Sequence, residues 1–230
     1  MKQNKQINAY LEQFDLKHQQ LELLELIKDH NPQFNGRFLD IGCANGIFVE
    51  AANKLFPEAK FSGFDINQKL IRMASERITE NNIIFFVSDI ENLNPSEKYD
   101  IITASGILSI FDDYKLIIDK WLNWLDEKGR LYIFGRFNTE DIDTKIYFRN
   151  NFVGGDWESG LTSYSIQSVS KYLEKKNLKY QFKRFHLGID LSKKQDPIRT
   201  YTVNCDNGSK MVINGANIIA EHYYLMIFLD

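Results

Sequence analysis

Three carboxylates and a short glycine loop follow apolar runs near the beginning of this 230-residue chain. Asp40 lies in an apolar run that leads into the loop 42–46, and Asp65 and Asp89 each come at the end of a later apolar run. Glycine lets a backbone approach a ligand closely, and an ionised carboxylate is an acceptor suited to paired hydroxyls or an amino group. This set of residues is typical of a site for a cofactor that carries a ribose and a base.

The elements that must position these residues alternate between strand and helix patterns. This alternation predicts a parallel sheet covered by helices on both faces, which binds its ligand at the carboxyl ends of the strands. Helical periodicity also precedes the first strand, from Tyr10 to His30. The predicted strands are 37–41, 60–65, 83–87, 99–104 and 130–137, and the predicted helices between them are 47–55, about 70–78 and 114–126.

Beyond Phe137 the pattern changes to a polar stretch without clear periodicity that ends at about Ser163. A helix is predicted from 165 to 176, with Ser165 as its cap. Strands are predicted at 178–187 and 223–229, with a turn at Asp196-Pro197 and a hairpin around 204–209 between them.

The loop Gly42-Cys43-Ala44-Asn45-Gly46, with Asp40 at its entrance, resembles the first motif of the class I S-adenosylmethionine (SAM)-dependent methyltransferases. That motif is an acid, any residue, then Gly-x-Gly-x-Gly, and Ala44 replaces the middle glycine here. The resemblance is specific for about residues 38–137 and only architectural outside them.

The resemblance implies an α/β fold with a seven-stranded, mostly parallel, doubly wound sheet. Its antiparallel last strand would lie between the fifth and sixth strands. The chain would then form one methyltransferase domain, with a helical cap at 1–35, a cofactor-binding half at 36–137 and an acceptor-binding half at 138–230.

The resemblance also assigns roles at the cofactor site. The glycine loop would wrap the methionine part of SAM, Asp65 would bind the ribose hydroxyls, and Asp89 would accept a hydrogen bond from the adenine amino group. Taken alone, Asp65 could cap the following helix and Asp89 could be a surface turn acid, but their order and spacing favour the cofactor. The predicted cofactor-binding residues are Asp40, Gly42, Ala44, Gly46, Asp65, Ile66, Asp89, Ile90 and Ser105.

Two histidines are candidate catalytic bases, because a base is needed where the methyl acceptor is a protonated amine or a hydroxyl. If the last strand is antiparallel, its start at His222 lies at the same sheet edge as His186, which follows the sixth strand. A buried structural role explains His222 equally well.

The later segments roof the acceptor pocket in this family, and their arginines offer a fork of donors suited to carboxylate or phosphate. Arg199 is the leading candidate, because Pro197 restrains the turn before it, and Arg136 is the second. An ordinary surface or salt-bridged role remains open for each arginine. The predicted substrate-binding residues are Arg199, Arg136, Tyr201, Arg149 and Trp157.

Composition narrows the class of protein. The formal net charge of −3 leaves no broad basic field, so a long nucleic acid is not an expected partner. Cys43 and Cys205 are too few for a disulfide framework or a four-thiolate zinc site, so a cytoplasmic protein without a metal site is expected. No apolar run approaches the roughly 18 residues of a membrane span. The oligomeric state is left open.

The sequence therefore predicts a SAM-dependent methyltransferase, with S-adenosylhomocysteine (SAH) as product, that acts on oxygen or nitrogen of a small polar metabolite, anionic in the narrower version. A nicotinamide-dependent dehydrogenase is the rival from another class, disfavoured because the third glycine of its loop is not at the required spacing. A SAM-binding protein that has lost its chemistry is a third alternative that the sequence leaves open.

Overall fold

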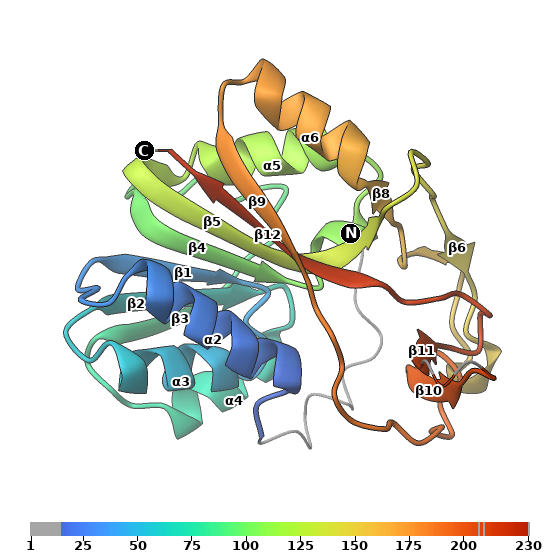
Figure 1. Ribbon diagram of the computed structural model, residues 1–230. Coiled ribbons are helices and arrows are strands. Elements are labelled where there is room, and N and C mark those ends of the chain that lie inside the picture. The colour runs from blue at the N-terminus through green and yellow to red at the C-terminus, as the bar shows by residue number, and fades with distance from the viewer. Residues whose placement is uncertain (1–14, 207, 209, 230) are drawn as a thin grey trace.

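A twisted, mostly parallel sheet forms the centre of the computed structural model, which describes residues 15–206, 208 and 210–229 (Figure 1). The strand order is β3-β2-β1-β4-β5-β12-β9, and the short β8 pairs with the end of β5. β12 runs antiparallel between β5 and β9, as the resemblance implied. The main strands are β1 (Arg37–Ile41), β2 (Lys60–Asp65), β3 (Ile83–Val87), β4 (Tyr99–Ser105), β5 (Leu125–Asn138), β8 (Tyr164–Ser165), β9 (Lys179–Arg184) and β12 (His222–Phe228).

Helices cover both faces of this sheet (Figure 1). Side chains of α2, α3 and α4 pack on one face and those of α5 and α6 on the other, so both faces are buried. The parallel strands are accordingly apolar along most of their length. The helices are α2 (His18–His30), α3 (Ile47–Leu55), α4 (Gln68–Arg77), α5 (Tyr114–Leu122) and α6 (Ile166–Lys175), with short 3₁₀ turns η1 (Leu108–Ile110) and η2 (Asn151–Val153).

Three of these helices are preceded by a capping residue whose side chain accepts hydrogen bonds from backbone N–H groups of the first turn. Asn67 caps α4, Asp113 caps α5 and Ser165 caps α6, each through a side-chain oxygen. Such caps satisfy backbone N–H groups that have no partner inside the helix. The predicted cap at Ser165 is confirmed.

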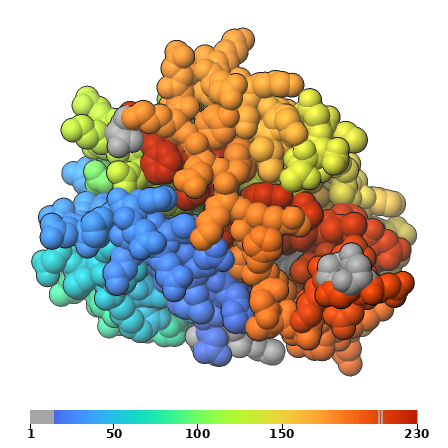
Figure 2. Space-filling view, in the orientation of Figure 1, coloured from blue at the N-terminus to red at the C-terminus, as the bar shows by residue number. Residues whose placement is uncertain are grey.

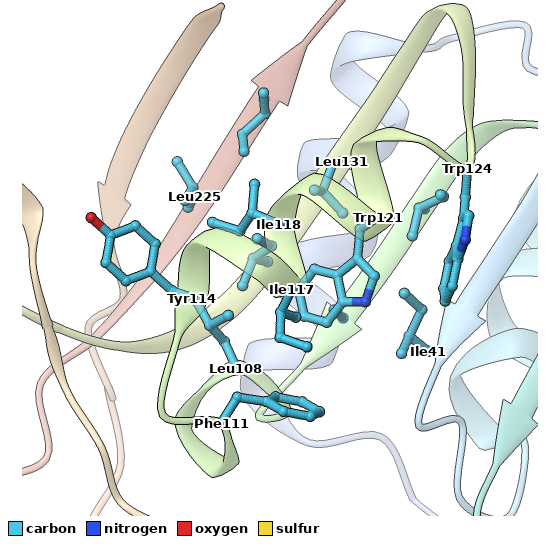
Figure 3. Close-up of a cluster of buried hydrophobic side chains, with 14 of the residues drawn as sticks. Ile41, Leu108, Phe111, Tyr114, Ile117, Ile118, Trp121, Trp124, Leu131 and Leu225 are labelled. Carbon is cyan, nitrogen blue, oxygen red and sulfur yellow. The ribbon is translucent and has the colours of Figure 1, made fainter. Parts of the chain in front are cut away.

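Alternation along the central strands divides the core into two layers. In β5, Leu131 and Ile133 face α5 and α6, whereas Tyr132 and Phe134 face α2 and α3. Figure 3 shows the first layer, in which the fully buried Trp121 of α5 lies among aliphatic side chains from α5 and the strands. This packing fixes the direction of the β5 side chains up to the sheet edge.

Small antiparallel pairs follow the main sheet in the second half of the chain. β10 (Tyr201–Asn204) pairs with β11 (Lys210–Ile213), which confirms the predicted hairpin, and β6 (Tyr147–Phe148) pairs with β7 (Glu158–Ser159). The segment after β5 and the segment after β9 meet where Asn150 Nδ2 donates to Asp196 Oδ1 at 2.8 Å.

Most predicted boundaries are confirmed, and β1, β2 and β3 have the predicted ends. The predicted helix 114–126 and strand 130–137 are wrong at their junction, since α5 ends at Leu122 and β5 begins at Leu125. The buried Leu125 already pairs with Tyr99, so the exposed residues 126–128 form an irregularity inside the strand rather than a turn before it.

The predicted first helix is also too long at its start. Residues 15–17 are not helical, and α2 begins at His18. Positions 10–14 of the predicted helix, with the rest of the predicted cap before Asp15, lie outside the described residues.

Two negative findings apply to the described residues only. None of their helices combines the length and the apolar character that a bilayer crossing requires. Nowhere among them do three potential metal-ligating side chains come together.

Candidate functional site

A cavity of about 360 Å³ opens at the carboxyl edge of the sheet, where the loops after β1, β2, β3 and β4 meet α2. The strand order reverses direction at this point, because β2 and β3 lie on one side of β1 and β4 and β5 lie on the other. Doubly wound folds bind their ligands at this position.

The cavity brings together almost all of the predicted cofactor residues. Gly46 is the exception, because it begins α3 behind the loop and does not line the space. The predicted residues in the lining are Asp40, Gly42, Ala44, Asp65, Ile66, Asp89, Ile90 and Ser105.

Backbone conformation explains why the loop after β1 needs small residues. Gly42 and Gly46 have φ values of +71° and +77°, and a Cβ atom at Gly42 would lie only 2.4 Å from Ile107 Cδ1. Ala44, which replaces the middle glycine of the motif, has φ +49°. A left-handed alanine costs roughly 1–2 kcal/mol, so the replacement keeps the loop shape at a modest cost in stability.

Asp65 joins two of the loops that line the cavity. Its carboxylate accepts hydrogen bonds from Ala44 N at 3.1 Å and from Asn67 N at 2.9 Å. Burial raises its pKa. Asn67 rather than Asp65 caps α4, so Asp65 closes the turn before that helix. Its carboxylate still has acceptor capacity toward the cavity.

Asp89 occupies the corresponding place after β3. Its carboxylate accepts from Glu91 N at 3.0 Å and from Asn92 Nδ2 at 3.4 Å. It also lines the cavity beside Ile90. Asp89 can therefore stabilise its own turn and still accept a hydrogen bond from a ligand.

Asp40 is the most deeply buried acid of the site, with 4% of its surface exposed. Thr103 Oγ1 donates to its carboxylate at 2.7 Å, because the two residues are register partners in the β1–β4 pair. Burial raises the pKa of Asp40 to about 7, and the nearby Asp65 adds to the rise. The carboxyl group therefore titrates near neutral pH, and a cation in the cavity would favour its ionised form.

His222 lines the cavity from the start of β12. Its ring stacks on Phe134 with centroids 5.2 Å apart and an interplanar angle of 7°. Burial, with a further contribution from the Arg136 charge, lowers the pKa of His222 to about 4. The imidazole is therefore neutral at pH 7. His186, in contrast, is exposed beyond the end of β9 and does not line the cavity.

The predicted substrate-binding residues lie outside the cavity lining, in different environments. Arg136 is 8% exposed, and its Nη2 donates to Ile219 O at 3.0 Å. Burial lowers the pKa of Arg136 to about 10, which leaves the guanidinium charged at neutral pH. Arg199 is half-buried, and its Nε lies 3.3 Å from the Asp196 carboxylate.

The remaining predicted residues, Arg149, Trp157 and Tyr201, take part in cation–π contacts outside the cavity. Arg149 lies over the Trp157 ring at 5.9 Å, and 69% of Trp157 is exposed. Lys193 lies 5.4 Å from the Tyr201 ring. Neither pair reaches the cavity lining.

Sequence reasoning considered Tyr10 and Phe14 of the first helix for the site, which lie outside the described residues, and missed the residues by which α2 lines it. Lys17, Gln19 and Gln20 line the cavity from the start of this helix. Burial lowers the pKa of Lys17, and the charge of Arg199 lowers it further, so the segment after β9 lies close to α2. Figure 2 shows the chain after β9, in orange, beside α2, in blue. No local pattern marks Lys17, because only the docking of α2 on the sheet brings it to the cavity.

Apolar residues after β4 were missed as well. Ile107, Ile110 and Phe111 line the cavity, and Phe134 of β5 completes this side. The position of this segment above the edge of β4 and β5 is the signal that could have identified it.

Comparison with known proteins agrees with the geometry. Residues 33–186 match the methyltransferase domain family. A malonyl-[acyl-carrier protein] O-methyltransferase of Ilyobacter polytropus is 26% identical over 67% of this chain and 60% of its own length. A trans-aconitate 2-methyltransferase of Yersinia pseudotuberculosis is 27% identical over 66% of this chain and 59% of its own length.

The chain thus spans less than two thirds of the length of these relatives. Among solved structures, the plantazolicin methyltransferase BpumL, in complex with a substrate analogue and SAH, superposes with a TM-score of 0.61. The superposition covers 97% of this chain and 90% of the BpumL chain, and the sequences are 12% identical. This similarity shows a shared fold. The motif resemblance to class I SAM-dependent methyltransferases is confirmed, and the chain belongs to the methyltransferase domain family.

Proposed function

We propose that this protein is a SAM-dependent methyltransferase that acts on oxygen or nitrogen of a small polar, anionic metabolite. The observation that carries the proposal is the convergence of the motif acids Asp40, Asp65 and Asp89 with the glycine loop on one cavity. Family membership and the names of the relatives support the same activity. The dehydrogenase and the non-catalytic alternatives have no comparable support.

The lining residues fit the parts of SAM. Asp65 and Asp89 are acceptors for a ribose diol and an adenine amino group, and the branched side chains of Ile66 and Ile90 suit the flat base. When ionised, Asp40 offers a buried negative charge. Electrostatic attraction to a cationic amino or sulfonium group is strongest in such a buried environment. When bound, SAM supplies an electrophilic methyl group.

The chain's own contribution to the reaction is alignment and exclusion of water. Holding a nucleophile about 3–3.5 Å from the methyl carbon, in line with the breaking bond, supplies ~7–11 kcal/mol. Ile107, Ile110, Phe111 and Phe134 provide an apolar wall that keeps water from this space.

His222 limits which acceptors suit this site. An imidazole whose pKa is about 4 removes protons poorly at neutral pH. An acceptor atom that is already deprotonated, such as a carboxylate oxygen, needs no such base. This favours the anionic acceptor and gives His222 a role in shaping the pocket; as catalytic bases, His222 and His186 remain predictions.

Isothermal titration calorimetry with SAH tests the cofactor assignment. Asp65→Ala removes the acceptor for the ribose diol, so the SAH affinity should fall at least roughly tenfold, from the loss of a charged hydrogen bond of about 1.5–3 kcal/mol. Glu80→Ala, which alters an exposed acid outside the cavity, is the matched control.

NAD serves as the second titrant and should give no heat of binding. Tighter binding of NAD than of SAH by the wild-type protein would overturn the proposal. Unchanged SAH affinity in Asp65→Ala would remove the ribose assignment alone.

A further inference from the structure

Arg136 is a buried cation that has no acidic partner within the described part of the chain. Its guanidinium donates to the neutral carbonyl of Ile219, and among the described residues no carboxylate pairs with it. By contrast, Arg184 pairs with Glu221 at 2.7 Å and Arg199 pairs with Asp196 at 3.3 Å. Burying an uncompensated charge is costly, so a buried guanidinium of this kind is suited to an anion from outside the chain.

The position of Arg136 connects it to the cavity. It follows Phe134 on the same face of β5, and it is the direct register partner of His222 in β12. Phe134 and His222 both line the cavity, so Arg136 is a direct neighbour of its wall, although it is not itself part of the lining. The electrostatic effect of Arg136 on the imidazole is a second indication that the two groups are close.

The segment between β11 and β12 contains a second buried donor. Asn214 is fully buried, and its Nδ2 has no hydrogen-bond partner among the described residues. The same segment supplies Ile219, the carbonyl partner of Arg136. Buried N–H groups without acceptors are rare.

We propose that Arg136 binds one carboxylate of a small dicarboxylate acceptor, whose second carboxylate receives the methyl group. An oxygen lone pair of this second carboxylate forms the new O–CH₃ bond while the S–CH₃ bond breaks and its electron pair stays on sulfur. The products are a monomethyl ester and SAH, and no proton moves. This inference rests on the proposed function and assigns the residue that selects the substrate class.

The first test is binding of malonate, succinate and glutarate to the complex of the protein with SAH, measured by calorimetry. Arg136→Gln should weaken binding of the best dicarboxylate at least tenfold and leave SAH affinity unchanged. Arg184→Gln is the matched control, because the Arg184 guanidinium pairs with Glu221 at the surface. The affinity of this variant for the same dicarboxylate should stay within twofold of the wild-type value.

Arg199→Gln tests the competing assignment made from the sequence. Because Asp196 already compensates Arg199, this change should affect dicarboxylate binding much less than Arg136→Gln does. A large loss in Arg199→Gln with normal binding in Arg136→Gln would overturn the inference.

A comparison on the wild-type protein avoids any dependence on folding of the variant. Succinamate has the size of succinate but carries a neutral amide at one end, so it should bind at least tenfold more weakly. Equal binding of the two compounds would overturn the inference. Arg136→Lys, which keeps the charge but loses the fork, should give an intermediate affinity.

Turnover with labelled SAM provides the final comparison. Arg136→Gln should raise the KM for the best dicarboxylate more than tenfold, and the product should be its monomethyl ester. Failure of SAH to bind would refute the proposed function. Normal SAH binding without binding or methylation of any dicarboxylate would refute this inference alone.

Discussion

Individual side chains at this site serve the fold and the ligand space at once. Asp65 and Asp89 hold their own turns through backbone N–H groups and also line the cavity. The sequence could predict this pair because each acid ends a recognisable strand. It could not predict the partner of Asp40, since Thr103 meets it only through the β1–β4 register.

Asp40 should make the free protein less stable as the pH rises. Its folded-state pKa of about 7 lies above the ordinary 3.8, so the folded state binds more protons than the unfolded state between these values. Stability therefore falls as the pH increases through this window. Above pH 7 the full penalty is present, at most about 4 kcal/mol at 1.36 kcal/mol per unit.

Asp40→Asn removes this penalty, since an amide is neutral at every pH and still accepts from Thr103. Urea unfolding at pH 5 and pH 8 should show the variant gaining most over the wild type at pH 8, while its SAH affinity falls. The neighbouring Asp65 also has a raised pKa, so part of the pH dependence should persist. Parallel pH profiles for the two proteins would contradict the assignment.

At the scale of elements, the ends of the strands and the starts of the helices set the positions of the loops that line the cavity. Local signals suffice for much of this, because caps and apolar periodicity act within a few residues. They fail at the junction of α5 and β5. There, pairing of Leu125 with Tyr99 decides that the strand begins before the exposed residues 126–128.

Asp113 tests the contribution of a cap to α5. Its side chain accepts from Lys115 N at 2.9 Å, and Asp113→Ala should lower the free energy of unfolding by about 0.5–2 kcal/mol. Asp113→Asn keeps the acceptor and should lose much less. Urea unfolding measures both variants, and equal losses would show that charge rather than capping matters.

For the whole molecule, the two segments outside the main sheet form one unit through a few buried polar contacts. Asn150, which is 6% exposed, receives the N–H of Phe152 on its carbonyl oxygen and donates to Asp196. The Pro197 carbonyl in turn accepts from Gly215 N at 2.7 Å. The segment that would roof the acceptor thus depends on contacts between residues far apart in sequence.

Asn150→Ala should loosen these segments without disturbing the cofactor half. Loss of the bond to Asp196 should cost about 1–3 kcal/mol and speed tryptic cleavage at Lys193 and Lys194, while SAH binding stays normal. Asn151→Ala, at an exposed neighbouring position, is the control. Equal cleavage of both variants and the wild type would show that the contact is dispensable.

The sequence by itself determined the glycine loop, the acids at or near the ends of β1, β2 and β3, and the order of strands and helices. These features depend on backbone freedom and on periodic apolar burial, which short stretches of chain encode. Only the tertiary structure decided that His222 stacks on Phe134 and that Lys17 reaches the cavity. It also decided that Arg136 is buried with no acid beside it among residues 15–206, 208 and 210–229, while Arg199 pairs with Asp196. Those properties depend on which distant residues exclude water and supply charge, and a linear pattern does not specify that.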